Sequence, residues 1–307
     1  MNVIFMGTPD FAVASLRAIH SHFPISAVVT VPDKPKGRGL TVKPSAVKET
    51  AMELGITTIL QPISLKEPSF LEAIRALKPD IIAVVAFRIL PREVFTAARL
   101  GAFNVHGSLL PKYRGAAPIN WAIINGETES GVTTFLLADS VDTGAMLGRR
   151  TVFIPDGMTA GELHDALMPL GAELALETCQ MLASGTINPI HQNDTEATKA
   201  PKIFRNDCHI NWNNSAQNVR NFIRGMSPHP GAWTLQADGK TLKILRASIV
   251  QEPALAAGEY AITDSTWLVG CADGMLALTE IQPEGKRAMN TLDILHGYRG
   301  ALKGVFA

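Results

Sequence analysis

The stretch Val3-Ile4-Phe5-Met6 begins the pattern that decides the fold, because four consecutive apolar residues are followed by helical spacing at residues 11–20. A short run of this kind, without polar alternation, is typical of a strand buried on both faces. Short apolar runs and helical patterns keep alternating through the first 180 or so residues. This alternation predicts a parallel sheet covered by helices on both faces.

Further strands and helices are expected in the same domain. The strands are placed at residues 25–31, 80–86, 101–105, 131–138 and 146–154, and the helices at residues 45–54, 69–77, 92–98 and 159–184. Gly185 is expected to end the last helix, as glycine often does. We therefore predict a doubly wound, Rossmann-like α/β domain over residues 1–185.

A change of character separates this domain from the rest of the chain. Residues 186–204 contain Asn188-Pro189, Asn193-Asp194 and Ala200-Pro201 with little apolar periodicity, which is typical of a linker. Beyond them we expect one short helix from near Ser215, and then short strands separated by turns at residues 232–236, 242–250, 267–271 and 275–281. This pattern predicts a small, OB-like β-barrel domain over residues 205–307.

The composition is that of a globular protein with no global preference for a charged partner. Of 307 residues, 46% are hydrophobic and 18% are charged, and 28 basic residues balance 28 acidic ones. Any contact with nucleic acid must therefore come from local patches. Because Cys179, Cys208 and Cys271 lack metal-binding spacing, we expect reduced thiols and no metal site. The sequence shows neither a secretory leader nor a membrane-spanning run, so we expect a cytoplasmic protein, and we expect a monomer.

The densest group of polar candidates lies at the end of the strand predicted at residues 101–105. Asn104 and His106 are two residues apart, so their side chains point to the same side of a strand. Ligands of open parallel sheets bind beyond the carboxyl ends of the strands, where this pair would lie. A buried asparagine and histidine that bond only to turn backbone would give the same pattern, and that alternative stays open.

A carboxylate follows in the turn before the last predicted strand of this domain. Asp142 precedes Thr143-Gly144, a setting in which an aspartate is usually only a solvated turn residue. If it reaches the same crevice, an amide, an imidazole and a carboxylate could together support acyl transfer. The amide would donate to an oxyanion, and the imidazole would stabilise it or accept a proton. Since no Gly-x-Ser-x-Gly elbow is present, we favour direct attack by an amine over a covalent acyl-enzyme.

The setting of these residues resembles a known family. Asn104-Val105-His106-Gly107-Ser108-Leu109-Leu110-Pro111, continued by Lys112-Tyr113-Arg114-Gly115-Ala116-Ala117-Pro118-Ile119, closely resembles the signature of the methionyl-tRNA formyltransferases. Asp142 lies 36 residues after His106, as in the wider group of formyltetrahydrofolate-dependent transferases. Residues 5–12, 32–39, 200–203, 210–212 and 224–233 also resemble the family, so the resemblance extends over nearly the whole chain.

The resemblance implies a donor, an acceptor and roles for the residues. The donor would be 10-formyltetrahydrofolate, and the acceptor would be the α-amino group of methionine on initiator tRNA. Asn104, His106 and Asp142 would be catalytic. The folate would be bound by a set of apolar and turn residues: Phe87, Ile89, Leu90, Pro91, Ser108, Leu109, Leu110 and Pro111. The sequence departs from the family in two places. Residues 86–91 are one residue shorter than the usual Ala-Tyr-Gly-x-Ile-Leu-Pro, and Ala145 replaces the acid that usually follows Gly144.

Contact with tRNA is expected from basic residues in both domains. Residues 33–49 contain five basic and two acidic residues, a net +3, and their glycines and prolines predict a loop without regular structure. Taken alone this would be a solvated surface loop; with the resemblance, Arg38 is expected near the acceptor end. The candidates for tRNA binding are Lys34, Lys36, Arg38, Lys43, Arg114, Lys202, Lys243, Lys286 and Arg287. Trp212 and Trp233 are expected in the core of the second domain, because apolar neighbours surround them.

Three other functions stay open at this point. A dinucleotide-dependent oxidoreductase would need the Gly-x-Gly-x-x-Gly turn, which is absent after Gly7. A different folate-dependent N-formyltransferase, acting on a sugar nucleotide or a ribonucleotide, or a formyltetrahydrofolate hydrolase would keep the same three catalytic residues. An RNA-binding protein with a decayed enzyme domain is the non-catalytic alternative.

Overall fold

A computed structural model describes residues 1–36, 41–250 and 255–306 of the chain, which separate into two compact units. The first unit comprises Met1–Pro118, Glu129–Val152 and His164–Ala200, and the second comprises Ile119–Thr128, Phe153–Leu163 and Pro201–Ala307. The second unit therefore includes two segments that precede residue 185 in the sequence. One of them contains most of a helix that the sequence pattern did not predict, α5 (Pro118–Ile124).

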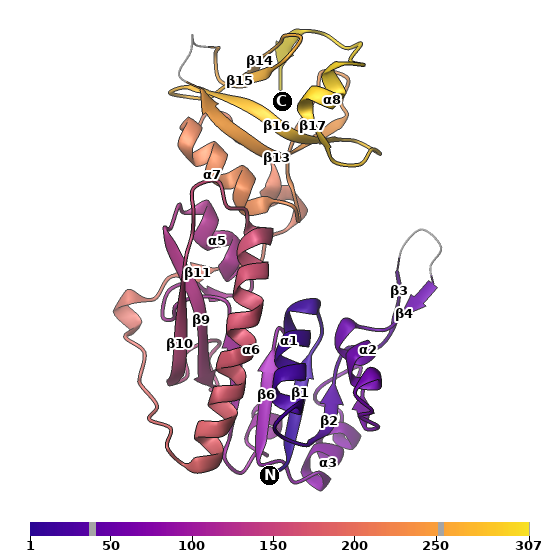
Figure 1. Cartoon of the computed structure of the whole chain (residues 1–307), viewed down its shortest axis with the longest axis vertical. Helices are drawn as coiled ribbons and strands as arrows, with labels where there is room; N and C mark the ends of the chain where they lie inside the picture. Colours follow the sequence, from indigo (N-terminus) through magenta and orange to yellow (C-terminus); the bar gives the residue numbers. More distant parts are fainter. Residues whose placement is uncertain (37–40, 251–254, 307) are drawn as a thin grey trace. The chain divides into compact units, whose positions relative to one another are not determined.

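The first unit is built on a seven-stranded sheet with the order β10-β9-β7-β6-β1-β2-β5 (Figure 1). In chain order its strands are β1 (Val3–Gly7), β2 (Ile25–Val29), β5 (Ile59–Leu60), β6 (Ile81–Val85), β7 (Gly101–His106), β9 (Glu129–Leu136) and β10 (Met146–Phe153). The five strands from β7 to β5 in this order run parallel, whereas β9 is antiparallel to β7. The predicted Rossmann-like α/β architecture is confirmed, and the six predicted strands lie within a few residues of their expected limits. The short edge strand β5 was not predicted, and the expectation of a wholly parallel sheet is wrong at β9.

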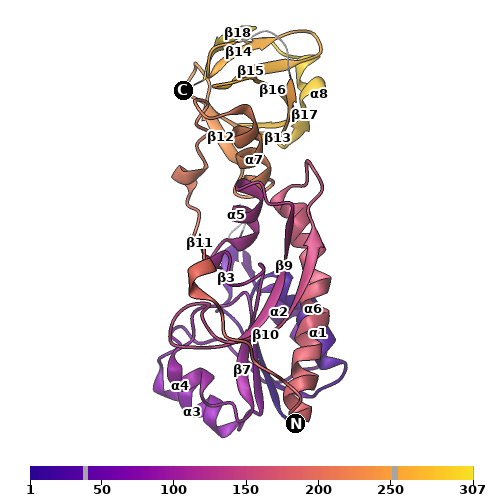
Figure 2. The same cartoon turned by 90° about the vertical axis from the view of Figure 1, so that its left-hand side faces the viewer.

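Helices cover both faces of this sheet, as the buried apolar strands require. Figure 2 shows α3 (Pro68–Ala76) and α4 (Arg92–Phe95) on one side, and α1 (Asp10–His20) and α6 (Ala160–Ser184) on the other. Phe70 of α3 and Val94 of α4 share a core with Ile4 and Ile82 of the sheet. On the opposite face, α6 contacts β9 through a hydrogen bond between Thr134 and Thr178 hydroxyls, 2.8 Å long. A further helix, α2 (Ala46–Glu53), follows the Ser45 cap.

The long helix α6 begins and ends on local signals that the sequence contains. The Thr159 hydroxyl accepts from the Glu162 backbone N–H at 3.2 Å, and Glu162 accepts in return from the Thr159 N–H at 2.8 Å. This reciprocal capping box satisfies donors that the first turn of a helix leaves free. At the other end Gly185 has a φ of +70°, the left-handed conformation that glycine adopts at little cost. The predicted helix is therefore confirmed at both ends.

The prediction that residues 33–49 lack regular structure is wrong for the part that the structure describes. β3 (Lys34–Lys36) and β4 (Thr41–Lys43) pair antiparallel, with Lys34 opposite Lys43. Pro35 has no N–H to donate, but both strands of this two-stranded ribbon are edge strands, where a proline is tolerated. Arg38, predicted to approach the tRNA, lies outside the described residues.

The second unit is an antiparallel sheet that curls around its own core. The order is β12-β13-β16-β15-β14-β18, and β17 pairs with β16. In chain order the strands are β12 (Ala232–Leu235), β13 (Thr241–Val250), β14 (Glu259–Ile262), β15 (Trp267–Gly270), β16 (Met275–Pro283), β17 (Met289–Asn290) and β18 (Lys303–Val305). The helices are α7 (Ala216–Met226), capped by Ser215 as predicted, and α8 (Thr291–Leu295).

Aromatic side chains fill the core of this second unit. Trp212 is buried and its ring stacks on that of Phe306, with centroids 5.7 Å apart. Trp233 is half-buried against the same core, and its indole N–H donates to the Arg205 carbonyl at 2.9 Å. The expectation that Trp212 belongs to the core is confirmed. All three cysteines are buried free thiols. Across the described ranges, no helix combines the length and apolarity needed to cross a bilayer.

Candidate active site

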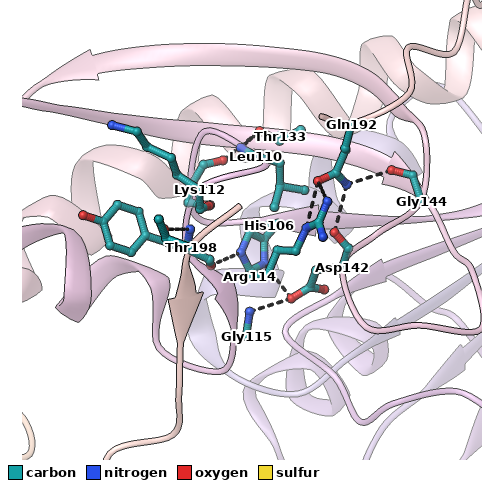
Figure 3. Close-up of polar contacts among 12 residues, drawn as sticks. His106, Leu110, Lys112, Arg114, Gly115, Thr133, Asp142, Gly144, Gln192 and Thr198 are labelled. Carbon is teal, nitrogen blue, oxygen red and sulfur yellow. Dashed lines mark hydrogen bonds and ion pairs between the residues drawn. The ribbon is translucent and has the colours of Figure 1, made fainter. Parts of the chain in front are cut away.

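The centre of the site is the imidazole of His106, the last residue of β7, which is 5% exposed. Its Nε2 lies 2.8 Å from the carbonyl oxygen of Tyr113. Because a carbonyl only accepts hydrogen bonds, Nε2 bears the proton and donates it. The other ring nitrogen, Nδ1, faces Asp142, whose Oδ2 is 3.7 Å away (Figure 3). This separation is within ion-pair range and longer than a hydrogen bond, so a second proton on Nδ1 would face a carboxylate.

Asp142 is held in place by its backbone as well as by its carboxylate. Its Oδ2 accepts the backbone N–H of Gly115 at 2.8 Å, and its side chain is 11% exposed. The residue has a φ of +56°, a left-handed conformation that aspartate tolerates better than most residues. The Gln192 side chain donates to the carbonyl of Asp142 and to that of Gly144, both at 2.8 Å. The turn predicted from the sequence is therefore a tightly bonded one.

Asn104 lies two residues before His106 on β7, so the strand presents both polar side chains at one face. Asn104 is half-buried. Within the described residues its side-chain amide makes no hydrogen bond, in contrast to His106 and Asp142. A partly exposed amide with unused donors is available to an oxygen atom of a bound molecule. The arrangement can therefore supply a donor, an imidazole and a carboxylate to one reaction.

The turn after β7 is fixed by internal hydrogen bonds. Ser108 is fully buried, and its hydroxyl donates to the Lys112 carbonyl at 2.6 Å. Leu110 is 1% exposed and its N–H donates to the Thr133 hydroxyl at 3.1 Å, while that hydroxyl donates to the Ser108 carbonyl at 2.7 Å. Of the four residues predicted here to contact folate, Leu109 is half-buried and the other three are buried. The peptide bond before Pro111 is cis.

The stretch that departs from the family pattern has an unusual backbone. Ala86, directly after β6, has a φ of +48°. Arg88 donates to the carbonyls of Pro62 and Ile63, each at 2.9 Å, and burial lowers the pKa of its guanidinium. The four residues predicted to contact folate here differ in exposure: Ile89 is exposed, Phe87 and Pro91 are half-buried, and Leu90 is buried in the core shared with α4. The exposed apolar area here is therefore mainly that of Ile89, because the Arg88 guanidinium lies over the half-buried Phe87 ring, 5.2 Å from its centroid.

The basic residues of the first unit are only partly free to bind an anion. Lys34 and Lys43 are exposed, and nothing is described of the Lys36 side chain. Lys48, by contrast, donates to Asp33 at 2.6 Å, and this bond is the main reason for the lowered pKa of that carboxyl. Arg114 is 15% exposed on its side chain, and it donates through Nε and Nη2 to Gln192 and through Nη2 to Asp194.

The basic residues of the second unit also differ in exposure and in whether another group already contacts them. Lys202 is exposed, and its ammonium lies 5.2 Å from the centre of the Phe204 ring. Lys243 is half-buried and donates to the Pro230 carbonyl at 2.7 Å. The last two predicted residues, Lys286 and Arg287, are exposed in the turn between β16 and β17.

A hollow of about 170 Å³ in the second unit is lined by Arg220, Arg224 and Arg246. Arg220 forms a two-pronged pair with Asp156, with distances of 2.7 and 2.8 Å. Arg246 pairs with Glu162 at 2.7 Å. Carboxylates therefore neutralise most of the charge that this hollow presents. In the part of the chain that the structure describes, no group of three or more metal-ligating side chains is placed to hold a metal ion.

Several residues of the site were not singled out by sequence reasoning. They are Tyr113 and Gly115, which bond His106 and Asp142, and Gln192 and Thr198, which come from the segment expected to be a linker. Their roles arise from backbone atoms or from contacts across long stretches of sequence, so no local pattern marks them.

Comparison with known proteins places this geometry in a family. A family described as formyl transferase matches residues 1–179, and its C-terminal domain matches residues 202–299. A methionyl-tRNA formyltransferase from Parabacteroides distasonis is 45% identical over 97% of this chain and 96% of its own. This chain belongs to the methionyl-tRNA formyltransferase family. A second relative of that name, from Caldanaerobacter subterraneus, is 46% identical over 97% of both chains.

The family membership confirms the expectation of a formyltransferase enzyme and does not favour the alternatives. The fold is shared more widely. An N-formyltransferase from Helicobacter canadensis, solved with folinic acid and dTDP-3-aminofucose, covers 92% of this chain and 98% of its own with a TM-score of 0.66. At 21% identity this likeness concerns the fold alone.

Proposed function

We propose that this enzyme transfers the formyl group of 10-formyltetrahydrofolate to the α-amino group of methionyl initiator tRNA, which gives N-formylmethionyl-tRNA for translation initiation. The observation that supports this most directly is the His106–Asp142 pair next to the unbonded Asn104 amide. The 45% identity to a methionyl-tRNA formyltransferase supports the choice of acceptor.

The chemistry is a direct attack of the amine on the formyl carbon. A bond forms between the amine nitrogen and that carbon, the nitrogen loses one proton, and the bond from the carbon to N10 of the folate breaks as N10 gains a proton. An α-amino group has a pKa of about 8, so a modest fraction is already neutral at pH 7. The protein needs to remove one proton and to stabilise a tetrahedral oxyanion.

Each of the three side chains has a part that its geometry suits. The Asn104 amide, which has unused donors, donates to the oxyanion. The His106 imidazole stabilises the same charge or accepts the proton through Nδ1, because Nε2 is already bonded to Tyr113. Asp142, with Oδ2 3.7 Å from Nδ1, orients the ring. No covalent intermediate on the protein is required.

The donor is proposed to lie against two segments of the first unit. Residues 87–91 supply an apolar surface, in which Ile89 is 77% exposed, and residues 108–111 form the buried, rigid turn behind the catalytic strand. A planar, partly apolar ring system fits an apolar surface with a few polar groups beside it. The amide of Asn104, on β7, is the polar group that we propose the formyl oxygen uses.

The tRNA is proposed to contact the exposed lysines at the β3–β4 ribbon. Lys34 and Lys43 lie opposite one another there, so two positive charges are held close together on a neutral protein. Arg38 stays a candidate on the resemblance alone, as does Arg114. Lys202, Lys286 and Arg287 are the proposed contacts from the second unit, with Lys243 already engaged by a carbonyl.

Formylation assays test the proposal with conservative variants. Wild type is given the folate donor and either charged initiator tRNA or an amino-sugar nucleotide. We expect turnover with the tRNA, and a loss of about 10²-fold or more in kcat for Asn104→Asp, His106→Gln and Asp142→Asn. His22→Gln is the control, because His22 is exposed between α1 and β2 and belongs to none of the proposed binding segments. Preference for the sugar nucleotide, or full activity in a His106→Ala, Asp142→Ala double variant, would overturn the proposal.

Two further proposals concern the molecule as a whole. We propose that it is a monomer, for which light scattering should give a mass near 33.0 kDa. We also propose that residues 1–185 and 205–307 are its domains, joined by residues 186–204, and that it works in the cytoplasm, where translation takes place.

A further inference from the structure

Residues 190–200 cross the active site of the first unit, and we call them the crossing segment. At one end Ile190 pairs with Met146, the first residue of β10, through hydrogen bonds of 2.7 and 2.8 Å. At the other end β11 (Lys199–Ala200) pairs in parallel with β8 (Arg114–Gly115). Both anchors are backbone hydrogen-bond pairs, so the two ends of the segment are fixed to the first unit. Figure 3 shows that Gln192 and Thr198 of this segment lie on either side of His106.

Gln192 binds the turn that presents Asp142. Its Nε2 donates to the carbonyls of Asp142 and Gly144 at 2.8 Å, and its Oε1 accepts from Arg114 Nε at 3.1 Å and Nη2 at 2.8 Å. Carbonyls only accept and a guanidinium only donates, so these partners fix which end of the amide is which. Both N–H donors of the Gln192 amide are used, so removing this side chain removes the two hydrogen bonds that support the turn.

Thr198 acts in the same way on the other partner of His106. Its hydroxyl accepts the N–H of Tyr113 at 2.8 Å, and its carbonyl accepts the N–H of Arg114 at the same distance. Tyr113 has a φ of +62°, a conformation rare for a bulky residue that its surroundings must maintain. The carbonyl of this residue is the acceptor for His106 Nε2.

We propose that Gln192 is a positioning residue for the transfer reaction, with Thr198 as its counterpart. Gln192 holds the Asp142 carboxylate opposite Nδ1, and Thr198 holds the Tyr113 carbonyl opposite Nε2, so the crossing segment sets both partners of the imidazole. The kinetic test of this proposal rests on the formyl-transfer function proposed above. It assigns to the expected linker a direct part in the geometry of the site.

The first test replaces Gln192 while keeping its length. Gln192→Met removes all four hydrogen bonds, and Gln192→Glu keeps an acceptor for Arg114 but cannot donate to the two carbonyls. Because a displacement of about 1 Å in a catalytic group can cost about 10²-fold, we expect kcat to fall by about that factor in both, with unchanged KM for donor and acceptor. Gln180→Met is the matched control, since Gln180 is exposed on α6.

A second measurement separates positioning from general stability. The ¹⁵N resonances of the His106 ring report which nitrogen is protonated and what each one faces. We expect them to shift in Gln192→Met and in Thr198→Val, and to stay as in wild type in Gln180→Met. Thr198→Ser keeps the hydroxyl, so its His106 resonances and its kcat should match those of wild type.

These outcomes distinguish a positioning role of Gln192 and Thr198 from a general contribution to stability. Unchanged His106 resonances in Gln192→Met and Gln192→Glu would refute the proposal, whether or not the melting temperature falls. If Gln192→Met does not fold, the Gln192→Glu and Thr198 variants carry the same test. If wild type formylates no tRNA, the function proposed above fails, while shifted His106 resonances would still support the positioning role.

Discussion

Gly144 offers the sharpest prediction, because a side chain there has no room. A Cβ built on Gly144 would lie 1.6 Å from the carbonyl oxygen of Leu136, an atom of the β9 backbone. Contacts below 3.0 Å are essentially never seen, so Gly144→Ala must separate the turn from β9 by about 1.4 Å. The clash is with backbone atoms of Leu136, so no side-chain rotation can relieve it.

The size of the effect follows from the hydrogen bonds that this displacement breaks. Gln192 donates to the carbonyls of Asp142 and Gly144 at 2.8 Å, and Leu136 donates to the Ala145 carbonyl at 2.9 Å. A shift of about 1.4 Å takes all three beyond bonding range. At about 1 kcal/mol each, their loss lowers the free energy of unfolding by about 3 kcal/mol. Asp142 moves with the turn, so kcat should also fall by about 10²-fold.

The assay combines urea unfolding, followed by circular dichroism, with formylation kinetics. Gly297→Ala is the control, because nothing lies within 4 Å of a Cβ at Gly297 and its backbone is not left-handed. The control should stay within about 0.5 kcal/mol of wild type. The reasoning would be refuted by a Gly144→Ala protein that matches the control in both stability and kcat.

Three more predictions concern charge and burial. The pKa of Asp156 is lowered, mainly because Arg220 donates a hydrogen bond to it. The contribution of this carboxylate to stability is therefore complete above the unfolded pKa of about 4 and is lost as the pH falls through the lower folded pKa. Arg220→Met should destabilise the protein more at pH 7 than at pH 3 in urea titrations, and an equal effect at both pH values would contradict the pairing. Burial raises the pKa of the Cys179 thiol to about 12, so iodoacetamide at pH 8 should label it only after unfolding, and rapid labelling of the native protein would show the burial to be wrong. Lys34→Ala and Lys43→Ala should each reduce the slope of log K against log salt for tRNA binding by about 1, whereas unchanged slopes would remove these lysines from the interface.

Much of the fold could be predicted from local patterns. The apolar runs at β1, β6 and β7 marked buried strands, and Gly185 marked the end of α6. Two errors had local causes. Proline and glycine at residues 33–49 suggested irregular structure, although β3 and β4 pair there, and α5 is too short for its periodicity to stand out.

The sequence by itself determined which chemical groups the site would contain. Asn104 and His106 share a face because side chains alternate along a strand, and the Asp-Thr-Gly turn marked Asp142. Only the tertiary structure decided how these groups are held. Gln192 lies 50 residues beyond Asp142 in the sequence, and Thr198 lies 85 residues beyond Tyr113. Backbone pairing of residues 190–200 with β10 and β8 brings them together. A hydrogen bond to a carbonyl leaves no periodicity in the sequence, so contacts of this kind appear only once the chain has folded.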